Sequence, residues 1–500
     1  MSSNDARNPQ PENHDSMKDM KATNGKWLVL LFVLTLPTVT PYLRGDGMGY
    51  YSYVASLVID GDLYLENEYR HQDPLHYRNL FDEQGQLRSH LYTRTGYVDN
   101  KFSVGPSILW APFFLLAHGF VKLHNALFPN RVIPADGFSL PYRYFCALGT
   151  ALYGFLGLLL AYTIVRAVTD EWSAFWATVG IWFASALPVY MYFLPFMSHA
   201  HSAFVCSLLV WYWWRTYPSR VGESENTPTH LYAAWFLLGL LTGFAFTTYY
   251  VNLLLGIFVL VDFVEFWGNR LGRHKGLPLP LLAMFYALGL FLGWLPTGII
   301  KWVIYGSPFQ LGYGDPWWFH DPRLLKVLFS AEHGLWTWTP IILLASVGFI
   351  PLIRKHPQLG WRCLLTFLIF WYFIASFDDW HGQSSFSNRF FVSLTPLFVC
   401  GLAAFLAWVR ERKRAMALRL VPTLIVVLVL WNIGFIFQWG VGLINNRGPI
   451  SWSKMVRQQF TVVPLKMVQT ARLFFTDRTA LVKAIEAQDF EEAKHYHIQR

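Results

Sequence analysis

An acidic residue between two glycines is the first place in this chain where chemistry can be expected. Asp46 lies in the segment RGDGMGYYSYVASL, directly after an apolar stretch that ends at residue 43. Glycines on both sides let the backbone bend closely around a ligand, and a carboxylate there can take a proton from a hydroxyl group. We interpret Asp46 as a candidate general base and Tyr50, in the same segment, as a candidate substrate-binding residue. Pairing of Asp46 with Arg44, or plain solvation in a loop, is the alternative.

Two basic residues have the properties of phosphate ligands. Lys101 opens the segment KFSVGPSILWAPFFLL, and Arg389 precedes the apolar segment FFVSLTPLF. A lysine at a membrane interface meets a phosphate as a point charge, whereas an arginine can bind it with two parallel hydrogen bonds. The alternatives are an ordinary lysine that reaches the lipid headgroups and an arginine that anchors a helix there.

Histidines form a third group of candidates. His199 and His201, in PFMSHAHSAF, lie at the start of an expected helix, and their spacing of two residues points them to different faces. They are therefore a poor metal pair, and His199 is better read as a ligand-binding or a packing residue. Glu332 and His333, in SAEHGLWTWTP, lie at another expected helix start and can line the same cavity.

The remaining acids and the cysteines give weaker signals. Asp60 and Asp62, in VIDGDLYLENEYR, resemble a divalent-metal or sugar site, but a turn around Gly61 explains them better. The four cysteines fall inside or beside apolar stretches without metal-ligand spacing, as packing residues do. We expect no cofactor, and a divalent cation stays an open alternative.

These candidates are embedded in a chain whose composition is that of a membrane protein. Of its 500 residues, 54% are hydrophobic and 14% are charged, whereas soluble domains carry roughly 25% charged residues. A helix of about 20 apolar residues crosses the hydrocarbon, and the net charge of +9 lies in short loops between apolar stretches. That pattern indicates membrane topology and argues against nucleic acid as a partner. The stretches without Asp, Glu, Lys or Arg are 27–43, 102–121, 144–165, 172–214, 226–261, 276–300, 333–353, 363–377, 390–409 and 420–446.

Lysines and arginines predict which loops face the cytoplasm. They concentrate before residue 27, in 266–276, near 355 and in 409–419, so by the positive-inside rule these segments are cytoplasmic. Alternation then places 44–101, 302–332, 378–389 and the tail after 446 outside. Asp46, Lys101, His199, His333 and Arg389 thereby fall at one membrane face, with the site facing the periplasm or exterior of the plasma (inner) membrane.

One apolar segment must fail to cross, because six lie between loops that require an odd number of crossings. We expect 103–121 to be a re-entrant or surface helix, since Pro106 and Pro112 interrupt it. The alternative fuses 231–266 into one crossing and moves His199 and His201 inside. The sequence predicts an all-α polytopic membrane protein of about 11–13 transmembrane helices. Its expected parts are a disordered cytoplasmic N-terminus (1–25), a transmembrane domain (26–446) with a long first outer loop, and a helical tail (447–500).

The order and spacing of several motifs resemble the multipass glycosyltransferases of the GT-C class. The similarity extends to bacterial Rgt-type transferases of lipopolysaccharide assembly, aminoarabinose transferases and protein O-mannosyltransferases, over about residues 27–410. It rests on RGDGMGYYSYVASL, NKFSVGPSILWAPFF, ADGFSLPYR, SHAHS, LFSAEHGLWTWTP and SNRFFVSLTP.

The resemblance implies a polyprenyl-phosphate sugar as donor and a catalytic acid in the first outer loop. That role falls on Asp46, and Lys101 and Arg389 match basic positions expected near the donor phosphate. The stretch WHGQSSFSNR departs from the usual Gly-rich pattern, which leaves the donor sugar and the acceptor (glycan, lipid or protein) open. We expect an inverting glycosyltransferase; a lipid-linked sugar transporter and a polysaccharide polymerase or ligase are the alternatives.

Overall fold

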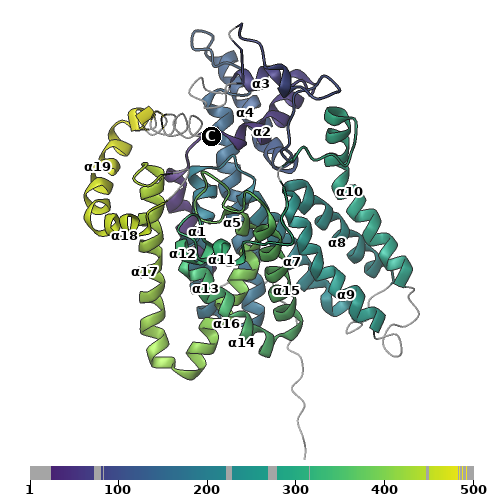
Figure 1. Ribbon diagram of the computed structural model, residues 1–500, viewed down its shortest axis with the longest axis vertical. Coiled ribbons are helices and arrows are strands. Elements are labelled where there is room, and N and C mark those ends of the chain that lie inside the picture. The colour runs from purple at the N-terminus through teal and green to yellow at the C-terminus, as the bar shows by residue number, and fades with distance from the viewer. Residues whose placement is uncertain are drawn as a thin grey trace, which may run out of the picture.

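The architecture is a bundle of helices, seen in a computed structural model that describes residues 24–71, 80–82, 84–220, 228–268, 279–314, 316–445 and 450–481 and a few later positions (Figure 1). The described residues form helices, loops and isolated β-bridges. Seven helices are long and apolar enough to cross a membrane, which confirms the all-α polytopic class. The expected number of crossings stays a prediction.

The seven long apolar segments are α4 (Gly105–Leu127), α5 (Leu140–Val168), Thr229–Thr248 within α8 (Pro228–Thr248), α10 (Leu279–Tyr305), α15 (Pro357–Ser376), Arg389–Arg412, which joins η6 (Arg389–Leu394) to α16 (Thr395–Arg412), and α17 (Arg414–Gly440). The other elements are α1 (Gly25–Thr35), η1 (Leu36–Thr38), α2 (Asp46–Ala55), η2 (Ser56–Asp60), α3 (Glu66–Arg70), η3 (Ser89–Leu91), α6 (Glu171–Phe183), η4 (Val189–Phe193), α7 (His199–Arg220), η5 (Tyr250–Gly256), α9 (Ile257–Gly268), α11 (Leu324–Phe329), α12 (Leu335–Trp338), α13 (Pro340–Val347), α14 (Phe349–Lys355), α18 (Trp452–Thr461) and α19 (Val463–Thr476).

The helix α16 lies at the centre of the bundle. Of its most apolar window, 94% is buried, against 17% for α10 and 33% for α17, and it packs against α5, α6, α7 and α13. Because η6 leads directly into α16, the most enclosed helix fixes the position of Arg389.

The first helix is shorter than the charge-free stretch 27–43 predicts. It ends at Thr35, followed by one 3-10 turn to Thr38 and extended residues up to Arg44. Proline has no backbone N–H to donate and disfavours helical backbone before it, and Pro37 and Pro41 fall in this segment. Asp46 therefore does not end a helix but opens a new one, α2.

The expected interruption of 103–121 is wrong, because α4 is a continuous helix. Pro106 occupies its first turn, where no backbone N–H is needed, and Pro112 is accommodated inside it. The indole of Trp110 bonds the Thr150 hydroxyl (2.8 Å), and His118 bonds Tyr142 (2.7 Å). The helix α4 thus runs antiparallel to the first part of α5, which continues beyond Thr150 to Val168. The expectation that this segment is a re-entrant or surface helix stays a prediction.

A seam of four glycines joins α8 to α10. A Cβ on Gly239 or Gly289 would lie 2.0 Å from a backbone carbonyl oxygen of the other helix, and one on Gly243 or Gly293 would lie 2.3 Å from it. Small residues spaced by four let two helix backbones touch in this way. The seam holds α8 and α10 together, and two residues of the site described below are Tyr249, just after α8, and Lys301, near the end of α10.

The tail folds back onto the bundle (Figure 1). The buried Gln438 of α17 donates to the Gln459 side chain (2.6 Å), which in turn donates to the Trp431 carbonyl (2.7 Å). Arg478 then donates to the Val39 carbonyl (2.7 Å). The expected helical tail is confirmed for α18 and α19; much of the expected helix 480–493 lies outside the described residues.

Candidate active site

The predicted base and the predicted arginine meet, although 343 positions separate them in the chain. The Nη2 atom of Arg389 donates to Oδ2 of Asp46 at 3.2 Å, with the two side chains 16% and 27% exposed. Gly45 has a φ of 53°, a left-handed value that glycine adopts without strain, and turns the chain into α2. Gly47 lies so close to Phe196 that a Cβ there would be 2.8 Å from the Phe196 Cβ. Both glycines therefore have the close-bending role that the sequence suggested.

The loop before Arg389 is stabilised by hydrogen bonds between its own residues and packs against the guanidinium. The Asn388 amide donates to the Trp380 carbonyl (3.0 Å), and the Ser385 hydroxyl bridges the carbonyls of His381 (3.1 Å) and Ser387 (3.0 Å). Gly382, with a φ of 68°, lies against Arg389, since a Cβ there would be 3.1 Å from Nε. The loop is thus a shaped backing for the arginine.

Several buried polar atoms around Arg389 have no hydrogen-bond partner among the described residues. They include Nε of Arg389, Oδ1 of Asn388, Oγ of Ser387 and Nδ1 of His199 and of His333. Buried polar groups in native proteins are nearly always satisfied. These atoms belong to Arg389, to the loop before it and to two residues whose pKa its charge affects, so hydrogen-bonding capacity stays unused in this region.

Tyr50 and His199 form the buried wall beside the ion pair. The Tyr50 hydroxyl accepts a hydrogen bond from Ser198 (3.2 Å), and its ring packs on Phe102 at 4.9 Å between centroids. Burial raises the pKa of Tyr50, and the nearby Asp46 carboxylate raises it further, so its phenol stays protonated. The His199 ring contacts Tyr190 (4.7 Å) and Tyr249 (5.3 Å). His201 instead contacts Trp110, which confirms that the two histidines face different sides.

Lys101 lies across the aromatic residues from Asp46. Its ammonium is 5.1 Å from the centre of the Tyr313 ring, and it forms no ion pair with another described residue. Burial raises the pKa of Tyr313, and Tyr50, Tyr249 and the Asp46 carboxylate raise it as well, although the residue is 39% exposed. Tyr313 therefore lies between the Lys101 ammonium, which is over its ring, and the Asp46 carboxylate, whose charge affects its pKa.

Lys301 is a residue of this region that sequence reasoning missed. It is 1% exposed, and its ammonium donates to the carbonyls of Asn100 (2.6 Å) and Phe102 (3.3 Å). Lys301 thus clamps the backbone on both sides of Lys101. The available signal was a lysine at the end of the charge-free stretch 276–300, which we took as a loop boundary; in fact α10 continues to Tyr305.

His333 lies behind the ion pair rather than in it. Its ring stacks on Trp338 (5.1 Å) and lies 6.5 Å from that of His381. Burial, with the positive charges of His381 and Arg389, lowers the pKa of His333 to about 3, so the ring is neutral at physiological pH. Its ring contacts are with Trp338 and His381 and not with Asp46, so its role as a substrate-binding residue stays a prediction.

The acids of the first loop form a turn. Gly61 has a φ of 76°, and Asp62 accepts hydrogen bonds from Ser56 (2.9 Å) and from the backbone of Tyr64 (3.0 Å). Glu68 is 1% exposed, and burial together with Asp60 raises its pKa to about 8. Within the described ranges no group of three His, Cys, Asp or Glu is placed to hold a metal ion.

An apolar cavity of about 550 Å³ lies beside the site, between η1, η4, α17 and α19. Aromatic and aliphatic side chains dominate its lining, among them Tyr192, Phe437 and Phe474. Arg44, two residues before Asp46, and Arg478 also line it. The cavity therefore joins apolar walls to positive charge near the candidate base.

Comparison with known proteins gave a structural likeness but no related sequence. No protein-family model and no curated protein matches the chain. Among solved structures it is similar to ArnT from Cupriavidus metallidurans bound to undecaprenyl phosphate, with 12% identity, a TM-score of 0.43, and coverage of 95% of this chain and 76% of that one. A likeness at this level says nothing about the substrates of this chain.

Proposed function

We propose that this chain is an inverting glycosyltransferase that moves a sugar from a polyprenyl-phosphate donor to a cell-envelope acceptor at the outer membrane face. The observation that carries the proposal is the pairing of Asp46 with Arg389 (3.2 Å), with Lys101 on the far side of Tyr313 from this pair. A carboxylate together with two nearby cations is what transfer from a phosphate leaving group requires.

Asp46 acts as the base in this scheme. The acceptor oxygen attacks the anomeric carbon, its proton passes to Asp46, and the bond between that carbon and the phosphate oxygen breaks with its electrons on the phosphate. Arg389 holds the carboxylate through Nη2 and keeps Nε unbonded among the described residues. A guanidinium can therefore orient the base and still offer a donor to a ligand.

Lys101 and Arg389 stabilise the departing phosphate. Fixed cations aimed at developing negative charge lower the barrier most in a site that excludes water, and Tyr50, Phe102 and Tyr249 form apolar surface around this one. Lys301 keeps Lys101 in place by binding the backbone carbonyls on either side of it. The neutral phenol of Tyr50 adds a donor rather than a second negative charge.

The apolar cavity supports a lipid-borne substrate. Ligand cavities commonly have volumes of about 300–1,000 Å³ and apolar walls with a few polar groups, and this one measures about 550 Å³. An aliphatic or isoprenoid chain lying there would bring its polar end to Arg44, which is two residues from the base.

The test is sugar transfer in membranes supplied with a radiolabelled pool of polyprenyl-phosphate sugars. We expect wild-type protein to label an envelope acceptor and Asp46→Asn to do so roughly 10²–10⁴-fold more slowly. The matched control is Asp321→Asn, which removes an exposed carboxylate from another loop and should keep the wild-type rate. Equal labelling by Asp46→Asn would reject this base, and movement of intact donor across the membrane without transfer would indicate a transporter.

A further inference from the structure

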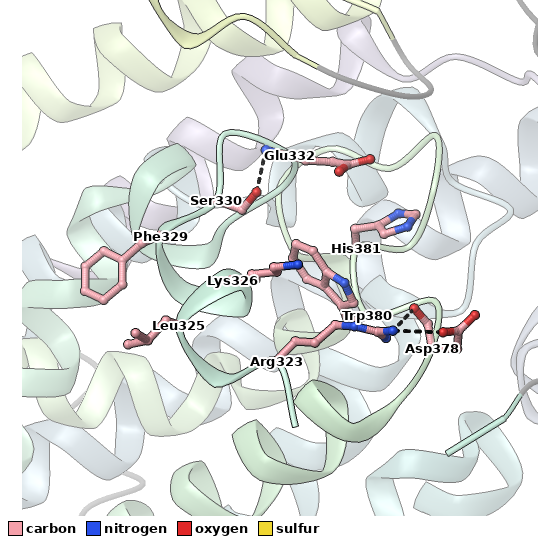
Figure 2. A pocket seen from close by; sticks show the side chains of 9 residues that line it. All are labelled: Arg323, Leu325, Lys326, Phe329, Ser330, Glu332, Asp378, Trp380 and His381. Atoms are coloured by element: carbon pink, nitrogen blue, oxygen red, sulfur yellow. Dashed lines mark hydrogen bonds and ion pairs between the residues drawn. The ribbon is translucent and has the colours of Figure 1, made fainter. Parts of the chain in front are cut away.

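A polar groove opens beside the loop that backs Arg389, and the proposed mechanism does not use it. Its volume is about 580 Å³. Figure 2 shows Trp380 near its middle, with Lys326 and His381 to either side, Glu332 above and the Arg323–Asp378 pair below. Phe329 and Leu325 lie at the left of this view, apart from the charged groups. The groove therefore presents charged and aromatic groups together.

The framework of the groove is rigid. Arg323 donates to both the carbonyl and the carboxylate of Asp378 (3.2 Å each), and the Trp318 indole donates to the same carboxylate (3.1 Å). Trp380 is 6% exposed, so it forms the packed side of the groove, and the Asn388 amide binds its carbonyl. These groups shape the groove without having to rearrange for a ligand.

Two charged groups in the groove are left unused by this framework. The Lys326 ammonium and the Glu332 carboxylate form no ion pair or side-chain hydrogen bond with any other described residue, and Lys326 is exposed. One offers three donors and the other only acceptors. A ligand whose groups both donate and accept is what this combination suits, and sugar hydroxyl groups do both.

The groove leads towards the reacting centre. The His381 ring lies 6.5 Å from that of His333, whose pKa Arg389 helps to lower. The next residue, Gly382, lies against the Arg389 guanidinium. A chain-like ligand lying along Lys326, Glu332 and His381 would therefore end next to Gly382, the loop residue that packs against Arg389.

We propose that this groove binds the saccharide acceptor, so that the transferred sugar is added to a glycan chain held by Lys326 and Glu332. The inference rests on the proposed glycosyltransferase function and names its acceptor class. The groove is polar and open, in contrast to the apolar cavity near Arg44, so it holds the hydroxylated part of a substrate rather than a lipid chain. Hydrogen bonds to charged groups give each of the two residues a direct share in affinity.

Binding of envelope oligosaccharides tests the proposal without any transfer step. The probe is the mixture released from the native cell envelope by mild acid and labelled with 2-aminobenzamide, in equilibrium dialysis against purified full-length protein. We expect Lys326→Gln and Glu332→Gln each to bind roughly 10- to 100-fold more weakly than wild type. Lys454→Gln, which alters an exposed lysine of α18, is the matched control and should bind as wild type does.

Three results would overturn the groove assignment. The first is that wild type does not bind the oligosaccharides, and the second is that Lys326→Gln and Glu332→Gln bind them as tightly as wild type does. The third is binding of phosphatidylglycerol vesicles that depends on Lys326, which would make the groove a lipid-headgroup site. Donor cleavage is measured on the same preparations. If wild type transfers sugar while the oligosaccharides do not bind, the glycosyltransferase function stands and only the acceptor groove fails.

Discussion

Two of the arginine–carboxylate clusters among the described residues are built differently, the one at Arg389 beside the first loop and the one at Arg362 at the other end of α15. Arg389 makes a single bond to Asp46 at 3.2 Å, and both side chains keep some exposure. Arg362 is 1% exposed and binds Asp262 (2.6 Å) and Glu265 (2.7 Å). It also donates to the carbonyls of Phe258 (3.3 Å) and Gln358 (3.0 Å).

The partners of the second cluster are equally satisfied. The Asp262 carboxylate accepts a further hydrogen bond from the Trp213 indole (2.9 Å), and the Arg362 guanidinium lies over the rings of Trp213 and Tyr217. Around Arg389, by contrast, Nε and neighbouring side-chain atoms lack partners among the described residues. An ion pair whose hydrogen-bonding groups all have partners in the protein holds helices together, whereas one with unused donors can bind a substrate. We therefore assign structure to Arg362 and chemistry to Arg389.

The largest expected effect breaks the structural cluster. Arg362→Met leaves Asp262 buried without its partner, which costs about 3–5 kcal/mol of stability, so the variant should express poorly and melt early in detergent. The double variant Arg362→Met/Asp262→Leu should regain much of that loss, because an apolar pair of similar volume often replaces a buried ion pair without cost. Normal melting of Arg362→Met would remove the contrast between the clusters.

The second prediction concerns the other arginine. Arg389→Gln should lower the transfer rate by roughly 10²–10³-fold, as loss of one preorganised donor does, while the melting temperature changes little because the pair is partly exposed. Melting and transfer are measured on the same preparation. A variant that unfolds yet transfers normally per folded molecule would reverse the two assignments.

The smallest effect comes from Glu68 in the first loop. Its pKa in the folded protein is about 8, raised from 4.5, so folding favours its protonated form. Its stabilising contribution is complete below the unfolded value and is lost as the pH rises through about 8. Between pH 5 and pH 9 the melting temperature of wild type should fall more than that of Glu68→Gln. Identical pH dependence in the two proteins would contradict the assigned burial.

The sequence predicted that Asp46 and Arg389 lie close together better than it predicted the packing. Charges in loops fixed the expected topology independently of Asp46, Lys101 and Arg389, and the structure brings Asp46 and Arg389 into contact and places Lys101 across the tyrosines from them. Local sequence also predicted the turn at Gly61 and the helix start at His199, because turns and helix starts depend on only a few neighbouring residues.

Features that depend on contacts between distant segments could not be predicted in the same way. Lys301 and Asp262 each border a charge-free stretch, which predicts a loop boundary at both. In the structure, Lys301 binds the backbone carbonyl of Asn100, and Asp262 is the buried ion-pair partner of Arg362. Pro37 and Pro41 indicate the early end of α1, whereas the apolar stretch 27–43 favours a longer helix. No local sequence pattern predicts that Gln459 of the tail forms a hydrogen bond with Gln438 of α17.

The most direct test of the central claim separates donor binding from transfer in Asp46→Asn. Purified wild type and variant are titrated with a polyprenyl-phosphate sugar, and single-turnover transfer is followed on the same samples. The base assignment predicts donor affinity within a few-fold of wild type and a rate of transfer lower by roughly 10²–10⁴-fold. Transfer at the wild-type rate by Asp46→Asn, or loss of donor binding in parallel with loss of transfer, would contradict it.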